Sequence, residues 1–202
     1  PCTLAAPARS GLIIKKSRFG GCVQRMPDRA SAQAHVDALW KEHPGATHIC
    51  WALLAGGQSA AVDDGEPGGT AGRPMLDVLR HQDLEGVQAT VVRYFGGVKL
   101  GAGGLVRAYT DAVAQALLGA HKVALQRLAH LHCSLPYALE GAVRRELAAA
   151  GACLESAAHA SDVRLHFTLP EPAAPALVQR LADLSHGAIT WSSVPGGDQT
   201  LD

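Results

Sequence analysis

The chain lacks most of the features that mark a secreted, membrane-embedded or zinc-binding protein. None of its five cysteines are spaced as Cys-x-x-Cys, and the set is odd in number and scattered. This pattern argues against a disulfide framework and a zinc site, and it is typical of reduced thiols. No apolar stretch approaches the roughly 20 residues of a spanning helix, and the N-terminus lacks the charged and apolar blocks of a signal peptide. We therefore expect a cytoplasmic protein with no membrane partner and no bound metal.

An excess of one charge is also missing. The 18 basic residues balance the 18 acidic residues, so the formal net charge is zero. This balance argues against a strongly basic nucleic-acid-binding protein, although it leaves room for local basic patches. A length of 202 residues suffices for two small domains, each with its own core.

The most informative motif is a glycine-rich run that follows a predicted strand at residues 87–95. The candidate anion-binding residues of this run are Arg93, Gly96, Gly97, Lys99, Gly101, Gly103, Gly104 and Arg107. Glycines permit positive φ and exposed N–H groups, and the start of a helix predicted over residues 105–118 would add unpaired donors. The alternative is that the glycines only let the strand turn sharply onto a packed helix.

Neither standard nucleotide-binding signature fits this run. Gly101 is followed by Ala102 and Gly103 where a P-loop needs Lys and Ser or Thr, and Val106 stands where the dinucleotide fingerprint needs a small residue. ATP and NAD are therefore poor candidates, and we expect no cofactor. Arg93 alternates with Val91 and Phe95, so it either caps a sheet face beside the glycines or anchors a partly buried ion pair.

A second loop, over residues 60–72, is polar and acidic. It brings Asp63, Asp64 and Glu66 close to Arg73. The carboxylates could bind a hard cation such as Mg²⁺, or they could act as a general acid and base pair. They could also cap backbone donors and pair with Arg73, Arg93 or Lys99, which would hold two loops together.

No residue stands out as catalytic. His48 lies in a strand predicted over residues 47–55 and is most simply a hydrogen-bonded core histidine. Nothing local lowers the pKa of Cys50 as a nucleophile would require.

The hydrophobic pattern predicts an α+β protein of two domains, residues 1–119 and 120–202. In the first we expect strands at 11–16 and 19–24, a helix at 28–42 and a helix at 74–81, besides the elements named above. From residue 121 the order strand, helix, strand, strand, helix, strand predicts a ferredoxin-like plait. Residues 119–122 are the expected hinge, and 195–202 the expected frayed tail.

Several sequence blocks together resemble one known family. The blocks are Lys16-Ser17-Arg18-Phe19, Thr47-His48-Ile49-Cys50-Trp51-Ala52, residues 63–75 and residues 92–109. They are similar to the YigZ/Impact family, whose signature is Arg-Tyr-Phe-Gly-Gly-x-Lys-Leu-Gly-x-Gly-Gly-Leu-x-Arg-Ala-Tyr. The departures are small: Gly68 stands where many relatives carry serine, and Trp51 where tyrosine is common.

The resemblance implies a fold for each domain and a role in translation. It implies that residues 1–119 form an Impact N-terminal-like domain, similar to domain IV of elongation factor G and to a ribosomal-protein domain. It implies that the C-terminal plait is similar to domain V of that factor. The eukaryotic members regulate translation initiation, and bacterial members have no settled activity.

Three functions stay open at this point. The leading hypothesis is a cytosolic protein that binds RNA or the ribosome and modulates translation. In this hypothesis Arg93, Lys99, Arg107 and the glycine amides contact phosphates. The second is an enzyme acting on a small phosphorylated or carboxylated substrate, with Asp63, Asp64 and Glu66 moving protons or holding a metal. The third is an adaptor that binds a protein partner.

Overall fold

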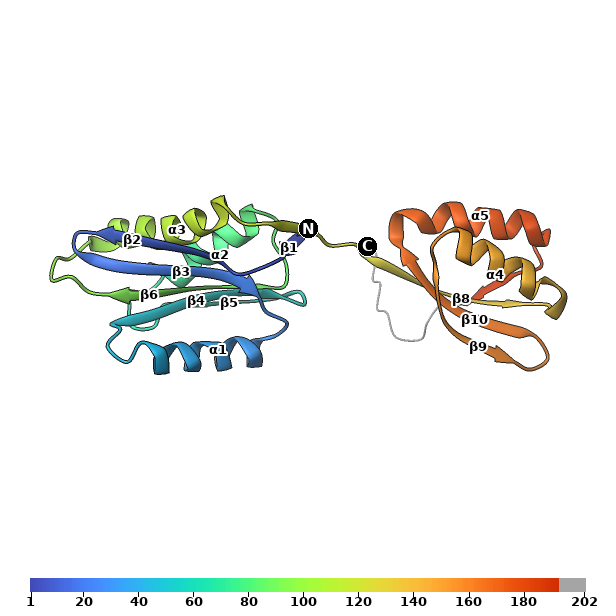
Figure 1. Ribbon diagram of the computed structural model, residues 1–202, viewed down its shortest axis with the longest axis horizontal. Coiled ribbons are helices and arrows are strands. Elements are labelled where there is room, and N and C mark those ends of the chain that lie inside the picture. Colours follow the sequence, from blue (N-terminus) through green and yellow to red (C-terminus); the bar gives the residue numbers. More distant parts are fainter. Residues whose placement is uncertain (193–202) are drawn as a thin grey trace. The chain divides into compact units, whose positions relative to one another are not determined.

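A computed structural model describes residues 1–192 of the chain, which form two compact units (Figure 1). The first unit is Pro1–Leu125 and the second begins at Gln126. The boundary lies after the predicted hinge at 119–122, because β7 (Lys122–Ala124) pairs with β1 (Cys2–Leu4) and so belongs to the first unit. The tail expected at 195–202 lies outside the described residues. Both units combine helices with antiparallel sheets, which confirms the α+β class.

The first unit is built on a five-stranded antiparallel sheet in the order β2-β3-β6-β4-β5. The strands are β2 (Ala8–Ile14), β3 (Ser17–Arg25), β6 (Val87–Tyr94), β4 (His48–Ala55) and β5 (Gln58–Val62). The helices are α1 (Arg29–Glu42), α2 (Gly72–His81) and α3 (Gly101–Leu118). Helices α2 and α3 cover one face, and α1 lies on the other (Figure 1). The strand β5 is absent from the sequence prediction, which reads part of it as loop.

The central strand β6, which leads into the glycine-rich run, is buried on both faces of the sheet. Its first seven residues are all buried because α1 covers one face and α2 and α3 the other. A strand covered on both faces is buried along its length, so the polar residues Gln88, Thr90 and Arg93 are buried together with the apolar ones. The face toward α3 packs Val91 against Tyr109 and its neighbours, and the face toward α1 packs Val92 with Trp51. These two cores fix the end of β6 and the loop that follows it.

Local signals set the helix starts differently in α1 and α3. In α1 the N-cap residue is Asp28, whose carboxylate accepts a hydrogen bond from the Ser31 amide at 2.7 Å. In contrast, α3 begins at Gly101, four residues before the predicted start, and no side chain caps it. Gly101, Gly103 and Gly104 therefore lie in the first turn of a helix rather than in a loop.

The second unit has the expected strand and helix order. Its elements are β8 (Leu128–Leu135), η1 (Tyr137–Leu139), α4 (Glu140–Ala149), β9 (Cys153–His159), β10 (Val163–Pro170), η2 (Glu171–Ala173), α5 (Ala174–Ser185) and β11 (Thr190–Ser192). The sheet order β11-β8-β10-β9 places the third strand of the unit between the first and second, and all pairs are antiparallel. This is the ferredoxin-like arrangement that the pattern predicts. No helix among residues 1–192 is long and apolar enough to cross a membrane.

Candidate functional site

The first carboxylate of the acidic loop, Asp63, holds the start of α2. Its two oxygens accept hydrogen bonds from the amides of Gly69, Ala71 and Gly72 at 2.8–3.1 Å. Burial alone would raise the pKa of this carboxyl, but the three amide bonds outweigh it and hold the pKa below its usual value. Asp63 therefore caps α2 from within the loop that leads into it, and its charge is already used within the fold.

The second carboxylate, Asp64, fixes the loop against β4. Its Oδ2 accepts the Ile49 amide at 2.7 Å, and its carbonyl oxygen lies 2.7 Å from Nδ1 of His48. Because Nδ1 faces a carbonyl oxygen, it must carry a proton, so Nε2 of neutral His48 has a free lone pair. That Nε2 lies 3.7 Å from Oε1 of Glu66.

The third carboxylate, Glu66, is buried against Arg93, with side chains only 3% and 6% exposed. Its Oε1 accepts hydrogen bonds from Nη1 of Arg93 and from the hydroxyl of Tyr109, the latter at 2.7 Å. Arg93 also donates through Nη2 to Oγ of Ser17 at 3.3 Å, and its buried Nε has no partner among the described residues. Of the two alternatives for Arg93, the ion pair is the observed one.

This pairing corrects the expectation that Arg93 contacts phosphate, because its guanidinium is the counter-ion of Glu66. Arg73 is corrected too: it pairs with Asp77 one turn along α2 at 3.1 Å, and both side chains are mostly exposed. No group of three or more His, Cys, Asp or Glu in the described part of the chain is arranged to hold a metal ion. Of the three readings of the acidic loop, the clasp between loops is the one these contacts match.

Cys50 and Tyr109 complete the buried cluster beneath the acidic loop. The Cys50 thiol lies 3.0 Å from the carbonyl oxygen of Asp63 and 3.4 Å from the Tyr109 hydroxyl. Burial raises the pKa of this thiol to about 12. Burial, together with Cys50 and Glu66, also raises the pKa of Tyr109, so its hydroxyl stays protonated and donates to Glu66. Cys50 is therefore an inert core thiol rather than a nucleophile.

The glycine loop bends back against the turn between β2 and β3. A Cβ at Gly96 would overlap the backbone of Lys16 and Ser17, so only glycine fits this close approach. The Gly96 amide donates to Oγ of Ser17 at 3.2 Å, and Gly97 and Gly101 have positive φ. Part of the loop's hydrogen-bonding capacity is thus used inside the fold.

A cavity of about 430 Å³ lies between the acidic loop and the glycine loop. One wall is the uncapped start of α3 with Lys99, Leu100, Gly101 and Ala102. The other wall carries His48, Gly65, Glu66, Pro67 and Arg93, with Thr47, Phe95 and Leu105 completing the lining. The structure therefore places residues of both candidate sites around one cavity. Arg93, Lys99 and Gly101 come from the predicted anion-binding set, and Glu66 comes from the acidic loop.

Arg107 and the remaining glycines lie apart from this cavity. Arg107 is in the second turn of α3 and lines a separate hollow of about 210 Å³ with Lys15, Gly104 and Asp111. A Cβ at Gly103 would lie 3.8 Å from a guanidinium nitrogen of Arg107. No ion pair joins Arg107 to Asp111 within residues 1–192.

His48 contributes more to the site than its place in a strand predicts, and Ser17 and Tyr109 are polar partners that the sequence does not single out. His48 faces the cavity, and the other two residues hold the buried arginine and glutamate. The only signal for these partners is that each lies in one of the conspicuous sequence blocks. Side chains that pair across 43 or 76 positions, as Tyr109 does with Glu66 and Ser17 with Arg93, leave no local pattern in the sequence.

The fold and the cavity define a two-unit α+β protein whose N-terminal unit joins an acidic clasp to an uncapped helix start. Residues 15–117 match the family model described as the Impact N-terminal domain, and residues 133–188 match one described as a domain of unknown function, DUF1949. The chain belongs to the IMPACT family.

Individual relatives match over different lengths. The chain is 36% identical over 181 residues to the IMPACT family member YvyE of Bacillus subtilis, which covers 87% of this chain and 82% of that protein. It is 46% identical to the Escherichia coli member YigZ over 118 residues, 56% of this chain and 58% of the relative. A solved structure of a hypothetical protein, 33% identical, matches with a TM-score of 0.71 and covers 97% of this chain and 98% of its own.

Proposed function

We propose that this protein is a cytosolic RNA- or ribosome-binding protein that modulates translation. The observation that carries the proposal is the uncompensated positive charge at the start of α3. No acidic residue lies in the first turn of this 18-residue helix, no side chain caps it, and Lys99 lies just before its N-cap residue, Leu100. An exposed lysine beside a positive dipole end favours an anionic ligand.

The electrostatics of the cavity support a phosphate there. Glu66 is the carboxylate in the lining, and Arg93 already neutralises it. Lys99 has no ion pair among the residues that the structure describes, so its charge remains available. Phosphates of RNA would contact Lys99 and the first amides of α3, with Arg107 adding a contact from its separate hollow. Membership of the IMPACT family, whose members are generally linked to translation regulation, supports the same field of action.

The salt dependence of RNA binding tests this assignment. Each cation that neutralises a phosphate contributes to the slope of log affinity against log salt, so Lys99→Ala with Arg107→Ala should flatten the slope by about 2. The matched control, Arg29→Ala with Lys122→Ala, removes two exposed cations of the same unit outside both hollows. The control should keep the wild-type slope. Equal slopes for both double variants would contradict the proposal.

His48 supports a second candidate, an enzyme acting on a small phosphorylated or carboxylated substrate. In the neutral ring its Nε2 carries the lone pair that a general base requires, and Asp64 holds the ring beside the cavity. Asp63 and Asp64 are engaged with backbone amides, so only His48 and Glu66 remain for proton transfer. A metabolite that raises the melting temperature of the wild-type protein, but not of His48→Gln, would favour the enzyme. No such shift across a broad panel of phosphorylated and carboxylated metabolites counts against it.

A further inference from the structure

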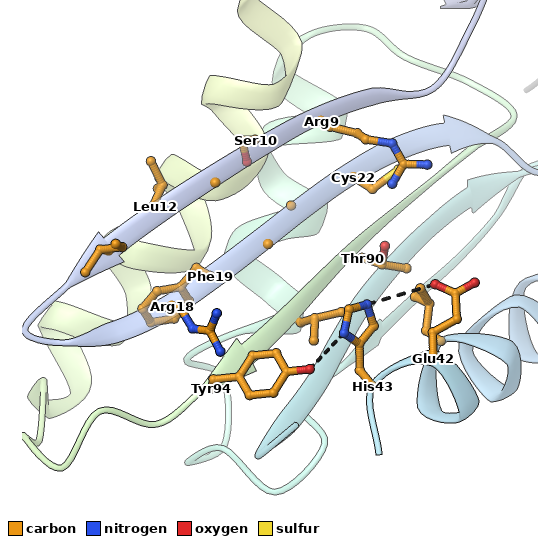
Figure 2. Close-up of a pocket in the computed structure, with 16 residues that line it drawn as sticks. Arg9, Ser10, Leu12, Arg18, Phe19, Cys22, Glu42, His43, Thr90 and Tyr94 are labelled. Atoms are coloured by element: carbon orange, nitrogen blue, oxygen red, sulfur yellow. Dashed lines mark hydrogen bonds and ion pairs between the residues drawn. The ribbon is translucent and has the colours of Figure 1, made fainter. Parts of the chain in front are cut away.

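Helix α1 leaves part of its face of the five-stranded sheet uncovered. The apolar cluster beneath α1 draws on β4, β5 and β6, and within the described residues it includes none from β2 or β3. A hollow of about 490 Å³ lies on the uncovered part (Figure 2). Its floor comes from β2, β3 and β6, and the C-terminal end of α1 forms a wall with Leu39, Glu42 and His43. This face is distinct from the cavity beside α3.

Two glycines of this floor are not required by the fold. Gly11 and Gly20 are cross-strand partners, and neither has a positive φ. A Cβ at Gly11 would meet no atom within 4 Å, and one at Gly20 would make only an ordinary 3.8 Å contact. Gly21 differs, because a Cβ there would lie 2.7 Å from the carbonyl oxygen of Ala112 in α3.

Glycine inside a strand weakens it and often marks a place where another molecule approaches the backbone closely. Gly21 is explained by its packing against α3, whereas Gly11 and Gly20 have no such internal reason. Together they form a flat patch of bare backbone on an exposed sheet face. Such a patch suits a planar group that lies flat on it.

Two arginines flank the glycine patch along the strands. Arg9 is paired in register with Cys22, and Arg18 with Ile13, so they are separated by four residues of β2, or about 13 Å. Both side chains are exposed, and neither has an ion pair among residues 1–192. The one carboxylate in the lining, Glu42, lies 4.0 Å from Nε2 of His43 at the wall. The floor therefore presents two free guanidinium groups.

Arg18 is also held as part of a planar stack. Its guanidinium lies 4.7 Å from the centre of the Tyr94 ring, and the Tyr94 hydroxyl lies 2.8 Å from Nδ1 of His43 (Figure 2). Arginine stacked on an aromatic ring keeps its donors free for a phosphate while offering a flat surface. The hollow thus combines cations, planar groups and bare backbone.

We propose that this open face binds single-stranded RNA, with a base lying flat on the Gly11–Gly20 patch and phosphates contacting Arg9 and Arg18. Flat contact requires a base that is not stacked within a duplex, which selects single strands. Two unpaired guanidinium groups favour a polyanion over a neutral protein surface. The inference rests on the proposed function, since it names the form of RNA and a second surface for it.

Replacing a glycine in the floor of the hollow tests RNA binding without destabilising the fold. Gly11→Thr places a β-branched side chain in open space on a strand, so the free energy of unfolding should be unchanged or slightly higher. The same side chain would cover the patch and should weaken binding of a fluorescent 12-nucleotide single strand about tenfold. Gly68→Thr is the matched control, because a Cβ there also meets nothing and Gly68 lines neither the hollow nor the cavity. It should bind like wild type.

A charge variant and a duplex probe complete the experiment. Arg9→Gln with Arg18→Gln should weaken single-strand binding about tenfold or more, and wild type should prefer the single strand to the matched duplex. If wild type binds RNA but Gly11→Thr and the arginine variant bind equally well, this inference is overturned and the proposed function stands. If wild type binds no RNA, the proposed function itself fails. Nuclease-resistant capture of a protein that is lost in Gly11→Thr would overturn the RNA assignment in favour of a protein ligand.

Discussion

Arg93 and Glu66, 27 positions apart in the sequence, form a buried ion pair that joins the central strand to the acidic loop. Ser17 and Tyr109 complete the set of hydrogen bonds around the pair. This arrangement places the acidic loop over the end of β6 and forms one wall of the cavity beside α3. The clasp is therefore a structural device that positions the candidate site.

Removing one partner of this pair should be costly. Arg93→Met leaves Glu66 buried without a counter-ion, so we expect the free energy of unfolding to fall by about 3–5 kcal/mol. Adding Glu66→Gln should recover part of that loss. Arg73→Met, at an exposed i,i+4 pair, should change stability by less than about 0.5 kcal/mol. Urea unfolding of the four proteins measures these differences, and an Arg93→Met loss no larger than that of Arg73→Met would contradict the burial argument.

The glycine loop contains a position that admits no side chain. Gly96→Ala would force the backbone of Lys16 and Ser17 to move, so we expect a loss of about 2–3 kcal/mol. Gly68→Ala is the control, because its new Cβ meets no atom within 4 Å and its φ is not positive. Its stability should stay within about 0.5 kcal/mol of wild type. Thermal unfolding distinguishes the two, and equal melting temperatures would show that the loop does not approach the β2–β3 turn as described.

Asp63 gives a prediction for the acidic range. Its folded pKa is lower than its unfolded pKa, so its contribution to stability is present above about pH 3.9 and is lost as the pH falls through the folded pKa. Asp63→Asn should destabilise the protein by about 1–2 kcal/mol at neutral pH, because a helix cap is weakened. The free energies of unfolding of the wild type and of Asp63→Asn should converge as the pH falls below about 4. A constant difference from pH 7 to 3 would contradict this role.

His132 gives a prediction of the same sign in the second unit, at a higher pH. Its ring stacks on that of His166 with centroids 4.1 Å apart and an interplanar angle of 6°. Partial burial, and then the neighbouring His166 and His130, lower the pKa of His132, so its protonation opposes folding. Stability should therefore decrease as the pH falls below about 6.5, and His132→Gln should reduce that decrease. NMR titration checks the cause directly, since a His132 pKa at or above its ordinary value would refute it.

Local pattern predicts much of this fold because most elements carry their own signal. The cap at Asp28, the buried run of β6 and the strand and helix order of the second unit all follow from periodicity and capping. The paired strands β1 and β7 do not, since each has three residues and they lie far apart in the chain. The first turn of α3 also escapes prediction, because glycine is a poor helix former and tertiary packing decides its conformation.

The candidate site was only partly predictable from the sequence, because its contacts join residues that lie far apart in the chain. Composition identifies the glycine run and the acidic loop, and the structure places them on two walls of one cavity. Composition does not reveal that Arg93 is used by Glu66, because a strand position fixes the face of a side chain and not its partner. Gly11 and Gly20 became informative only when the space around each could be compared with that around Gly21.

Co-sedimentation with purified small ribosomal subunits and with free RNA tests the central claim most directly. Wild-type protein should bind at least one of them at about 50 mM salt, and the binding should fall steeply as the salt is raised to about 200 mM. Protein that stays in the supernatant with both at low salt, while remaining folded, would contradict the claim that this chain acts through RNA or the ribosome.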